Sequence, residues 1–419
     1  DVETYSPADI KAGVYRYAEQ AELLIVGWAI GTNAPRAWVP ADGPPPDELI
    51  EALHAPDVLL VAHNAPFERA VIGHQWPDAA PAARWHCTAA QARAHGYPGK
   101  LELLTKALKL SVGKDTAGTR LINLFSKPSR YGTWREARAA KPDDWAAFVR
   151  YCVQDVAVLQ AVYAALPVVN NTERERKVWL LDQAINDRGI AVDVELARAA
   201  VALCAGDSAS VADDLAVLTG GAVASPKQVA ALRAFLAEHG CYVDDLRAGT
   251  VEAVLAELAA RGALDTVAAK VLRLRQRAAM SSVSKYDALL AGVSSDGRLR
   301  GTLTYCGAAR TGRWSGAVFQ PQNLPKGSLH SEASMEGAVQ AIKVGAVDLI
   351  TDDVAELASS AIRGGIVASP WHVLAVADLS NIEGRVLAWV SGEDWVLDAI
   401  RRNDAGVGPD QYVMTYASS

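Results

Sequence analysis

The feature that most constrains the fold of this chain is a set of carboxylate motifs spread over three distant segments. The first is Asp1-Val2-Glu3, the second runs from Asn64 to Glu68, and the third contains Tyr151 and Asp155. Two divalent metal ions that act together lie about 3.5–4 Å apart, and several carboxylates must converge on them. A fold that uses these residues as one site therefore has to bring the three segments to one point.

Spacing within the first and third motifs favours this convergence. In a strand Asp1 and Glu3 point to the same face, and in a helix Tyr151 and Asp155, four residues apart, share a face. Taken singly, Tyr151 is more typical of a packed aromatic and Asp155 of a solvated acid. The helix that carries them is predicted to bury a stripe formed by Trp145, Phe148, Cys152, Val156, Leu159 and Val162.

Size and composition set broad limits. A chain of 419 residues exceeds the size at which single hydrophobic cores usually split, so two or three domains are expected. Its net charge of −7 gives no overall positive field, and a nucleic-acid partner would need a local basic groove. The five cysteines contain no C-x-x-C pair, which argues against a zinc knuckle or a disulfide framework and indicates a reducing compartment. No apolar run approaches the roughly 18 residues that span a bilayer.

The pattern of apolar residues changes along the chain. Residues 1–168 alternate strand-like and helical segments, with buried strands predicted at 23–30 and 58–62. This part is predicted to be α/β, residues 169–297 mainly helical, and residues 298–419 partly strand-like again. The later strands are expected at 299–305 and 373–377.

Helix signals dominate the middle region. Thr172 with Glu175 forms a capping-box pattern, and the helix it begins is predicted to bury Val178, Leu181 and Ile185. Another helix is expected to start at Ser225-Pro226 and a long basic one to cover 263–292. The basic face of the long helix is more typical of a solvated surface than of a DNA-binding one. Its cations are Lys270, Arg273, Arg275, Arg277 and Lys285.

The three carboxylate motifs resemble the exonuclease motifs of the proofreading domain in family A DNA polymerases. That domain belongs to the DEDD exonuclease superfamily, in the branch with tyrosine in its third motif. Segments 85–88, 98–102 and 121–128 are similar to bacteriophage and prophage members, and the resemblance covers essentially the whole chain. It implies a ribonuclease H-like 3'-5' exonuclease domain with a mixed sheet at 1–168, a helical connector and thumb-like region at 169–297, and a partial polymerase palm at 298–419.

The resemblance also implies roles for the motif residues. Two Mg²⁺ or Mn²⁺ ions would be held by oxygen ligands, would activate a water and would stabilise the leaving 3' oxygen. Tyr151 would orient the water, and Asn64 would position either substrate or scaffold. Glu68 stands where the family usually has Asp, so a different or water-mediated contact with metal is expected. His63 is predicted to be a structural hydrogen-bonding residue. The implied metal ligands are Asp1, Glu3, Glu68 and Asp155.

Two later segments resemble polymerase motifs. Residues 309–316 and 320–325 are similar to the T-G-R-x-S and Q-N-x-P signatures, although a surface loop with incidental arginines is the alternative. Residues 373–387 are similar to motif A, which would make Asp378 a catalytic metal ligand after a strand. In that motif Glu383 would exclude a ribose 2'-hydroxyl and Arg385 would contact the nucleotide. The implied DNA-binding residues are Arg310, Arg313, Gln322 and Asn323.

The nucleotide-binding helix and the H-D-E motif of the family do not follow Asp378 in this sequence. We therefore expect a chain cut at both ends that does not extend primers by itself. The intact protein is expected to be a monomer in the cytoplasm of a bacterial host, away from membranes, acting on primer-template DNA, single-stranded 3' ends and dNTPs. The alternatives are a stand-alone DEDD-type exoribonuclease and a DNA-binding scaffold with a degenerate exonuclease site.

Overall fold

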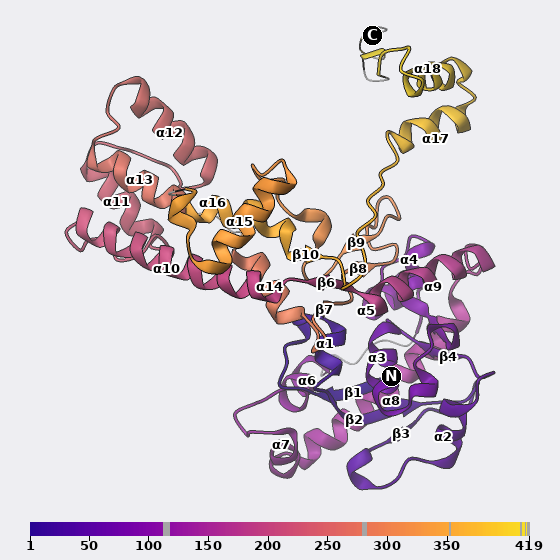
Figure 1. Cartoon of the computed structure of the whole chain (residues 1–419). Helices are drawn as coiled ribbons and strands as arrows, with labels where there is room; N and C mark the ends of the chain where they lie inside the picture. Colours follow the sequence, from indigo (N-terminus) through magenta and orange to yellow (C-terminus); the bar gives the residue numbers. More distant parts are fainter. Residues whose placement is uncertain (112–117, 279–282, 352, 411–412, 415, 417–419) are drawn as a thin grey trace. The chain divides into compact units, whose positions relative to one another are not determined.

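A computed structural model describes residues 1–111, 118–278, 283–351, 353–410, 413–414 and 416 (Figure 1). By internal contacts the chain divides into two compact units, Asp1–Ala368 and Ser369–Ser419. The structure is a mixture of helices and small sheets, as the α/β prediction expected. The predicted domain boundaries at 168 and 297 both fall inside the first unit and stay predictions.

Two small sheets form the strand-containing part of residues 1–168. Strands β1 (Val2–Tyr5), β2 (Glu22–Trp28) and β3 (Arg36–Trp38) are antiparallel in the order β1-β2-β3, whereas β4 (Leu60–Ala62) pairs in parallel with β5 (Trp85–Cys87). Antiparallel and parallel pairings therefore occur in separate sheets, and not in the single mixed sheet that was expected. Both predicted apolar runs contain strands, over shorter spans, because only the residues with a pairing neighbour enter a ladder.

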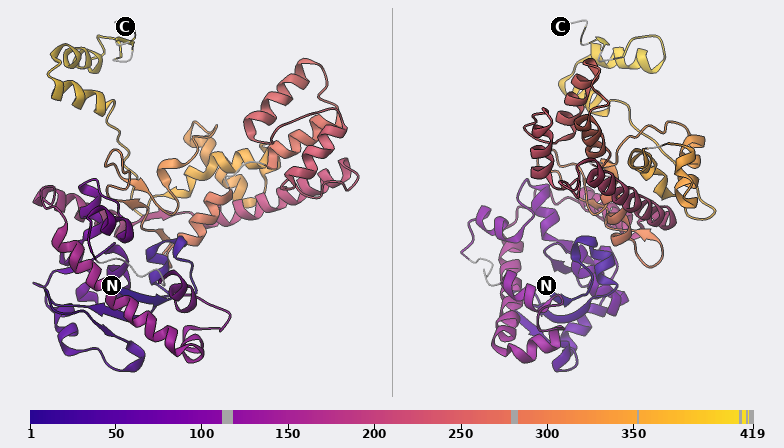
Figure 2. Two further views of the ribbon diagram at one scale, coloured as in Figure 1. Left: turned by 180° about the vertical axis from the view of Figure 1, so that it is seen from behind. Right: turned by 90° about the vertical axis from the view of Figure 1, so that its left-hand side faces the viewer.

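Eight helices surround these sheets in the described part of residues 1–168. They are α1 (Val14–Ala18), α2 (Asp47–His54), α3 (Pro66–Gln75), α4 (Thr88–Ala94), α5 (Leu101–Ala107), α6 (Gly118–Phe125), α7 (Trp134–Ala140) and α8 (Pro142–Ala165). Helix α8 has Pro142 in its first turn, where a backbone N–H would have no partner within the helix, so its absence loses no hydrogen bond. The helix packs against β2 (Figure 2). All six residues of its predicted stripe are buried, which confirms that face.

The middle of the chain is helical, as predicted. Thr172 Oγ1 accepts a hydrogen bond from the Glu175 amide at 3.2 Å, which confirms the N-cap half of the predicted capping box. The Glu175 carboxylate accepts from the Tyr305 hydroxyl at 2.5 Å. The helix predicted at Ser225 starts at Val229, and the predicted basic helix corresponds to two helices, with residues 279–282 outside the described ones. The helices are α9 (Glu173–Arg188), α10 (Val194–Leu218), α11 (Val229–Glu238), α12 (Ala248–Ala260), α13 (Val267–Ala278) and α14 (Val283–Gly292).

The buried face of α9 differs from the prediction. Leu181 is 55% exposed, and the buried residues are Trp179, Asp182, Gln183 and Asn186. Val178 and Ile185 are half-buried, and the buried face is turned from the apolar period toward Asp182 and Asn186. Polar groups there find hydrogen-bond partners in neighbouring segments, which removes the cost of burying them. Helix α9 therefore presents a polar face to its surroundings inside the first unit.

Short strands and two further helices complete the first unit. Strands β10 (Ile366–Val367), β6 (Ile190–Val192) and β7 (Arg298–Leu299) form one sheet in that order, and β8 (Leu303–Thr304) pairs with β9 (Ser315–Gly316). The strand predicted at 299–305 is thus two short strands with different partners. Helices α15 (Glu332–Val344) and α16 (Val354–Ala361) pack against α10.

The second unit consists of an extended segment and two helices, α17 (Ile382–Ser391) and α18 (Asp394–Asp404). A helix after Asp378 was predicted and is present. The strand predicted at 373–377 is wrong: Val373 and Val376 are 89% and 92% exposed, and the segment has no pairing strand among the described residues. A strand needs such a neighbour to satisfy its amides and carbonyls.

Within the described residues, no helix combines the length and the apolar character needed to cross a membrane.

Candidate metal centre

Strand β1 holds the first carboxylates of the site. The Asp1 ammonium donates to the Gly27 carbonyl at 3.1 Å, and the Gly27 amide donates to the Asp1 carbonyl at 2.9 Å. Glu3 pairs with Ile25 in the ladder and is only 8% exposed. The first motif is therefore anchored to β2 by backbone bonds, and its carboxylates are held on a fixed element.

Helix α8 brings the third motif to the same place. A Cβ atom on Gly27 would lie 2.8 Å from Cys152 Sγ and 3.0 Å from the Cys152 carbonyl oxygen, so the absent side chain allows β2 and α8 to touch. One turn of α8 then presents Tyr151, Cys152 and Asp155, all buried, beside β1. The close contact at Gly27 is what brings the two motifs together.

The electrostatics of Tyr151 link the first and third motifs. Burial raises the pKa of its hydroxyl, and the negative charges of Asp155 and Glu3 raise it further. Its side chain is also hydrogen-bonded to Asp155. At neutral pH the phenol therefore keeps its proton and acts as a donor beside two carboxylates.

The second motif contributes Glu68 from the first turn of α3, which begins with Pro66. Glu68 is 4% exposed, and burial raises the pKa of its carboxyl to about 7, opposed by the nearby Asp1 ammonium. Its Oε2 atom is buried and accepts no hydrogen bond from the described residues. Because a buried carboxylate oxygen needs a donor or a cation, this orphaned atom fits a metal-binding role.

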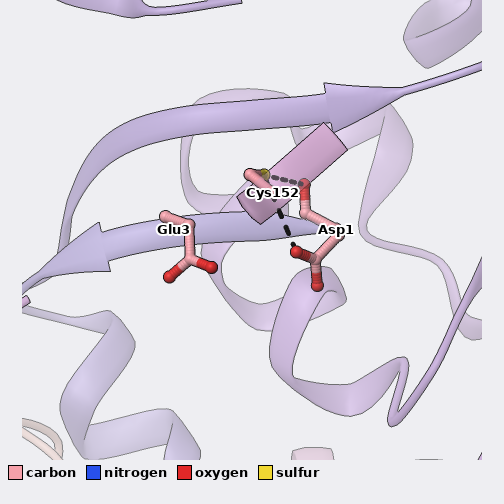
Figure 3. A group of neighbouring side chains, drawn as sticks. All are labelled: Asp1, Glu3 and Cys152. Carbon is pink, nitrogen blue, oxygen red and sulfur yellow. Dashed lines mark hydrogen bonds between the residues drawn. The ribbon is translucent and has the colours of Figure 1, made fainter. Parts of the chain in front are cut away.

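One cluster among the described residues has the geometry to hold a metal ion. Asp1, Glu3 and Cys152 each offer a ligand atom, and these atoms lie within 4.8 Å of one another (Figure 3). With Asp155 and Glu68 nearby, the oxygen donors suit Mg²⁺ or Mn²⁺. Sequence reasoning placed Cys152 only in the buried stripe. Its position three residues before Asp155, on the same face of a helix, was the signal that it could approach the same ligands.

Asn64, from the second motif, lines a cavity. It adopts a left-handed backbone conformation with φ of 70°, one that asparagine tolerates better than most residues. The cavity, about 310 Å³, is also lined by Lys11, Arg93 and the polar face of α9. The neighbouring His63 contacts Thr88 Oγ1 at 3.0 Å and the Gly99 carbonyl at 2.9 Å, as expected of a structural residue.

A second polar group, missed from the sequence, ties α3 to α9. Arg69, directly after Glu68, donates to both carboxylate oxygens of Asp187, at 3.0 and 2.5 Å. It also donates to Gln183 Oε1 at 3.1 Å and to the Tyr15 hydroxyl at 3.2 Å. The arginine side chain is 7% exposed. The helix that carries Glu68 is thereby fixed against α9.

The predicted DNA-binding residues lie on and after the turn between β8 and β9. Arg310 and Arg313 are exposed there. The next residue, Trp314, donates from Nε1 to Asp182 Oδ1 at 2.8 Å, which holds the turn against α9. Asn323 donates to Gln320 Oε1 at 3.0 Å, and Gln322 Oε1 lies close to Gly316.

The second unit contains the residues assigned to motif A. Asp378 and Glu383 are both exposed, and Asp378 belongs to no three-ligand cluster among the described residues. Arg385 forms a two-point ion pair with Asp404, at 2.6 Å to each oxygen, and donates to the Ser380 carbonyl at 2.8 Å. Within this unit Arg385 thus connects the start of α17 with the end of α18.

The raised pKa of Glu68 gives a prediction for the metal-free protein. The unfolded carboxyl releases its proton near its ordinary pKa of 4.5, whereas the folded one releases it at about 7. Stability therefore falls as pH rises through this window, by up to about 3 kcal/mol. The free energy of unfolding would be measured in urea at pH 5 and pH 7 with a chelator present. Glu68→Gln should remove most of the difference between the two values. Exposed Glu51 on α2 provides the control. In Glu51→Gln the difference in unfolding free energy between pH 5 and pH 7 should match that of the wild type. If Glu68→Gln kept the wild-type difference in unfolding free energy between pH 5 and pH 7, the raised pKa of Glu68 would be contradicted.

No family model matches this chain. It is 36% identical over 407 residues to a protein named DNA polymerase from Bacillus phage SP02, a match that covers 95% of this chain and 62% of the relative. The chain thus spans less than two thirds of that relative's length. Among solved structures, the POL domain of Pol1 from M. smegmatis, in complex with DNA primer-template and dNTP, matches with a TM-score of 0.47 and 19% identity. That match covers 92% of this chain and 58% of the other.

Proposed function

We propose that this chain is part of a family A DNA polymerase and that its first 168 residues form a ribonuclease H-like 3'-5' exonuclease domain. The observation that carries the proposal is the gathering of Asp1, Glu3, Glu68, Tyr151 and Asp155 from three distant segments. The identity of 36% to a phage DNA polymerase over most of this chain supports the same assignment.

In the proposed reaction Asp1, Glu3, Glu68 and Asp155 would hold two Mg²⁺ or Mn²⁺ ions. When bound, the ions supply an activated water and stabilise the charge on the leaving 3' oxygen. Tyr151 keeps its proton and donates a hydrogen bond, which orients the water for attack on the terminal phosphodiester. Glu68 must lose its proton to act as a ligand, and a cation beside it favours the ionised carboxylate.

The cavity beside Asn64 is proposed to receive the single-stranded 3' end. At about 310 Å³ it falls at the lower end of the size range of small-molecule sites. Lys11 and Arg93 provide positive charge for phosphate groups, and the polar face of α9 provides hydrogen-bonding groups for bases and sugars. Asn64, which lines this cavity, would position the strand.

The remainder of the chain is proposed to belong to the polymerase part. Exposed Arg310 and Arg313, with Gln322 and Asn323, would contact primer-template DNA. In the intact protein Asp378 would bind a second pair of metal ions, with Glu383 and Arg385 beside the incoming dNTP. We propose that the intact protein works as a monomer in the cytoplasm of the bacterial host.

Substrate choice tests this proposal against an RNA-processing nuclease. Residues 1–419 should release nucleotides from the 3' end of single-stranded DNA faster than from a structured RNA of the same sequence. The rates would be compared under one set of salt and Mg²⁺ concentrations, because phosphate contacts depend on salt. A clear preference for the RNA would favour the exoribonuclease alternative, and no hydrolysis of either would favour a DNA-binding scaffold.

A further inference from the structure

Cys152 has no role in the hydrolysis proposed above, yet it lies among the metal ligands (Figure 3). We propose that Cys152, Asp1 and Glu3 form a binding site for a thiophilic divalent cation such as Cd²⁺ or Zn²⁺. The inference rests on the proposed function only in taking the same two carboxylates as ligands. Its consequence is a site that a soft cation occupies in competition with Mg²⁺.

The distance between sulfur and oxygen fits such an ion. Cys152 Sγ lies 3.6 Å from Asp1 Oδ2. In a tetrahedral zinc site, ligands at about 2.3 Å for sulfur and about 2.1 Å for oxygen lie about 3.6 Å from each other. A carboxylate oxygen of Glu3 is within 4.8 Å of both atoms and is the third ligand of the proposed site.

The thiol is held in place by its surroundings. Cys152 has no exposed surface, and its sulfur packs against the position where a Gly27 Cβ would stand. The Asp1 backbone is bonded in both directions to the same glycine. Asp1 directly precedes β1, and its two backbone bonds to β2 hold it beside the Cys152 sulfur of α8.

A further buried carboxyl in the first unit is that of Glu68. Glu68 is 4% exposed, and its buried Oε2 accepts no hydrogen bond from the described residues. This carboxyl is close enough to Asp1 to be influenced by its ammonium charge. Glu68 is therefore a buried carboxyl outside the group of three ligand atoms.

Sulfur makes the ligand set selective. Thiolate ligands select soft ions, whereas Mg²⁺ requires oxygen. As the metal–sulfur bond forms, the thiol proton passes to solvent. The other cysteines, Cys87, Cys204, Cys241 and Cys306, belong to no comparable three-ligand group among the described residues.

Cadmium binding to the full chain tests the inference without DNA. Titration with Cd²⁺ alone, followed by the ultraviolet thiolate-to-cadmium charge-transfer band, should give one tight site per chain. Cys152→Ser should abolish the band of that site, whereas Cys204→Ser, which changes another buried cysteine, should leave it intact. Glu3→Gln, which keeps the thiol, should weaken Cd²⁺ binding at least about tenfold.

Two results would overturn the inference: a tight-site band that survives in Cys152→Ser, or an unchanged Cd²⁺ affinity in Glu3→Gln. Thermal unfolding of each variant checks that it is folded. If Cys152→Ser has a lowered melting temperature, the Cd²⁺ affinity of Glu3→Gln decides the test. Failure of the cation-site proposal can be told apart from failure of the exonuclease proposal. A chain that binds Cd²⁺ as described but does not hydrolyse DNA would contradict only the exonuclease proposal.

Discussion

Replacing Asp155 by alanine should reduce Mg²⁺-dependent release of nucleotides by about 10³-fold or more. Metal ions in such sites supply several kcal/mol of transition-state stabilisation, and each 1.36 kcal/mol is worth about a factor of ten in rate. Asp155 is 5% exposed and lies beside Tyr151, so its loss would remove both the proposed metal ligand and the acceptor of the tyrosine hydrogen bond. The measurement is the initial rate of mononucleotide release from a labelled single strand.

Two further variants make this result specific. Asp143→Ala removes an exposed carboxylate from the first turn of the same helix and should keep the wild-type rate. Asp155→Asn keeps the size of the buried side chain, so a similar loss of activity would assign the effect to charge. Near-normal release by Asp155→Ala would refute its role as a ligand.

Replacing Arg69 by methionine should lower the free energy of unfolding by about 2–3 kcal/mol. Breaking a buried ion pair costs about 3–5 kcal/mol, and the cost is smaller here because Asp187 keeps 38% of its side chain exposed. The variant also removes donors from Gln183 and from the Tyr15 hydroxyl. Urea unfolding at neutral pH measures the change.

The matched control is Arg261→Met, which removes an exposed arginine paired with Glu257 on the same helical turn. Surface pairs of this kind contribute about 0.3–0.5 kcal/mol, so little change is expected. Because Arg69 follows Glu68, its variant should also weaken Mg²⁺ binding, measured by calorimetry. An equal, small effect of both substitutions would show that the junction of α3 with α9 contributes little.

Much of the local structure could be predicted from the sequence. The buried stripe of α8 and the cap of α9 depend on residues close together in the chain, so periodicity and capping rules were sufficient. The approach of Asp1 to Tyr151 and Asp155 was also expected, because the ordering of the motifs required it. Their roles in catalysis stay predictions.

Features that depend on distant partners could not be predicted in this way. The buried polar face of α9 is stabilised by Arg69 and Trp314, which lie far from it in the sequence. The strand predicted at 373–377 failed because an apolar run does not show whether a pairing strand is available. The approach of Cys152 to Asp1 depends on the missing side chain at Gly27.

The most direct test of the central claim is release of nucleotides from DNA labelled separately at each end. The chain should remove mononucleotides from the 3' end in the presence of Mg²⁺, stop when a chelator is added, and resume when Mg²⁺ or Mn²⁺ is restored. The 5' label should stay on a progressively shorter strand. Release that begins at the 5' end, or that continues unchanged with the chelator, would contradict a two-metal 3'-5' exonuclease built on Asp1, Glu3, Glu68 and Asp155.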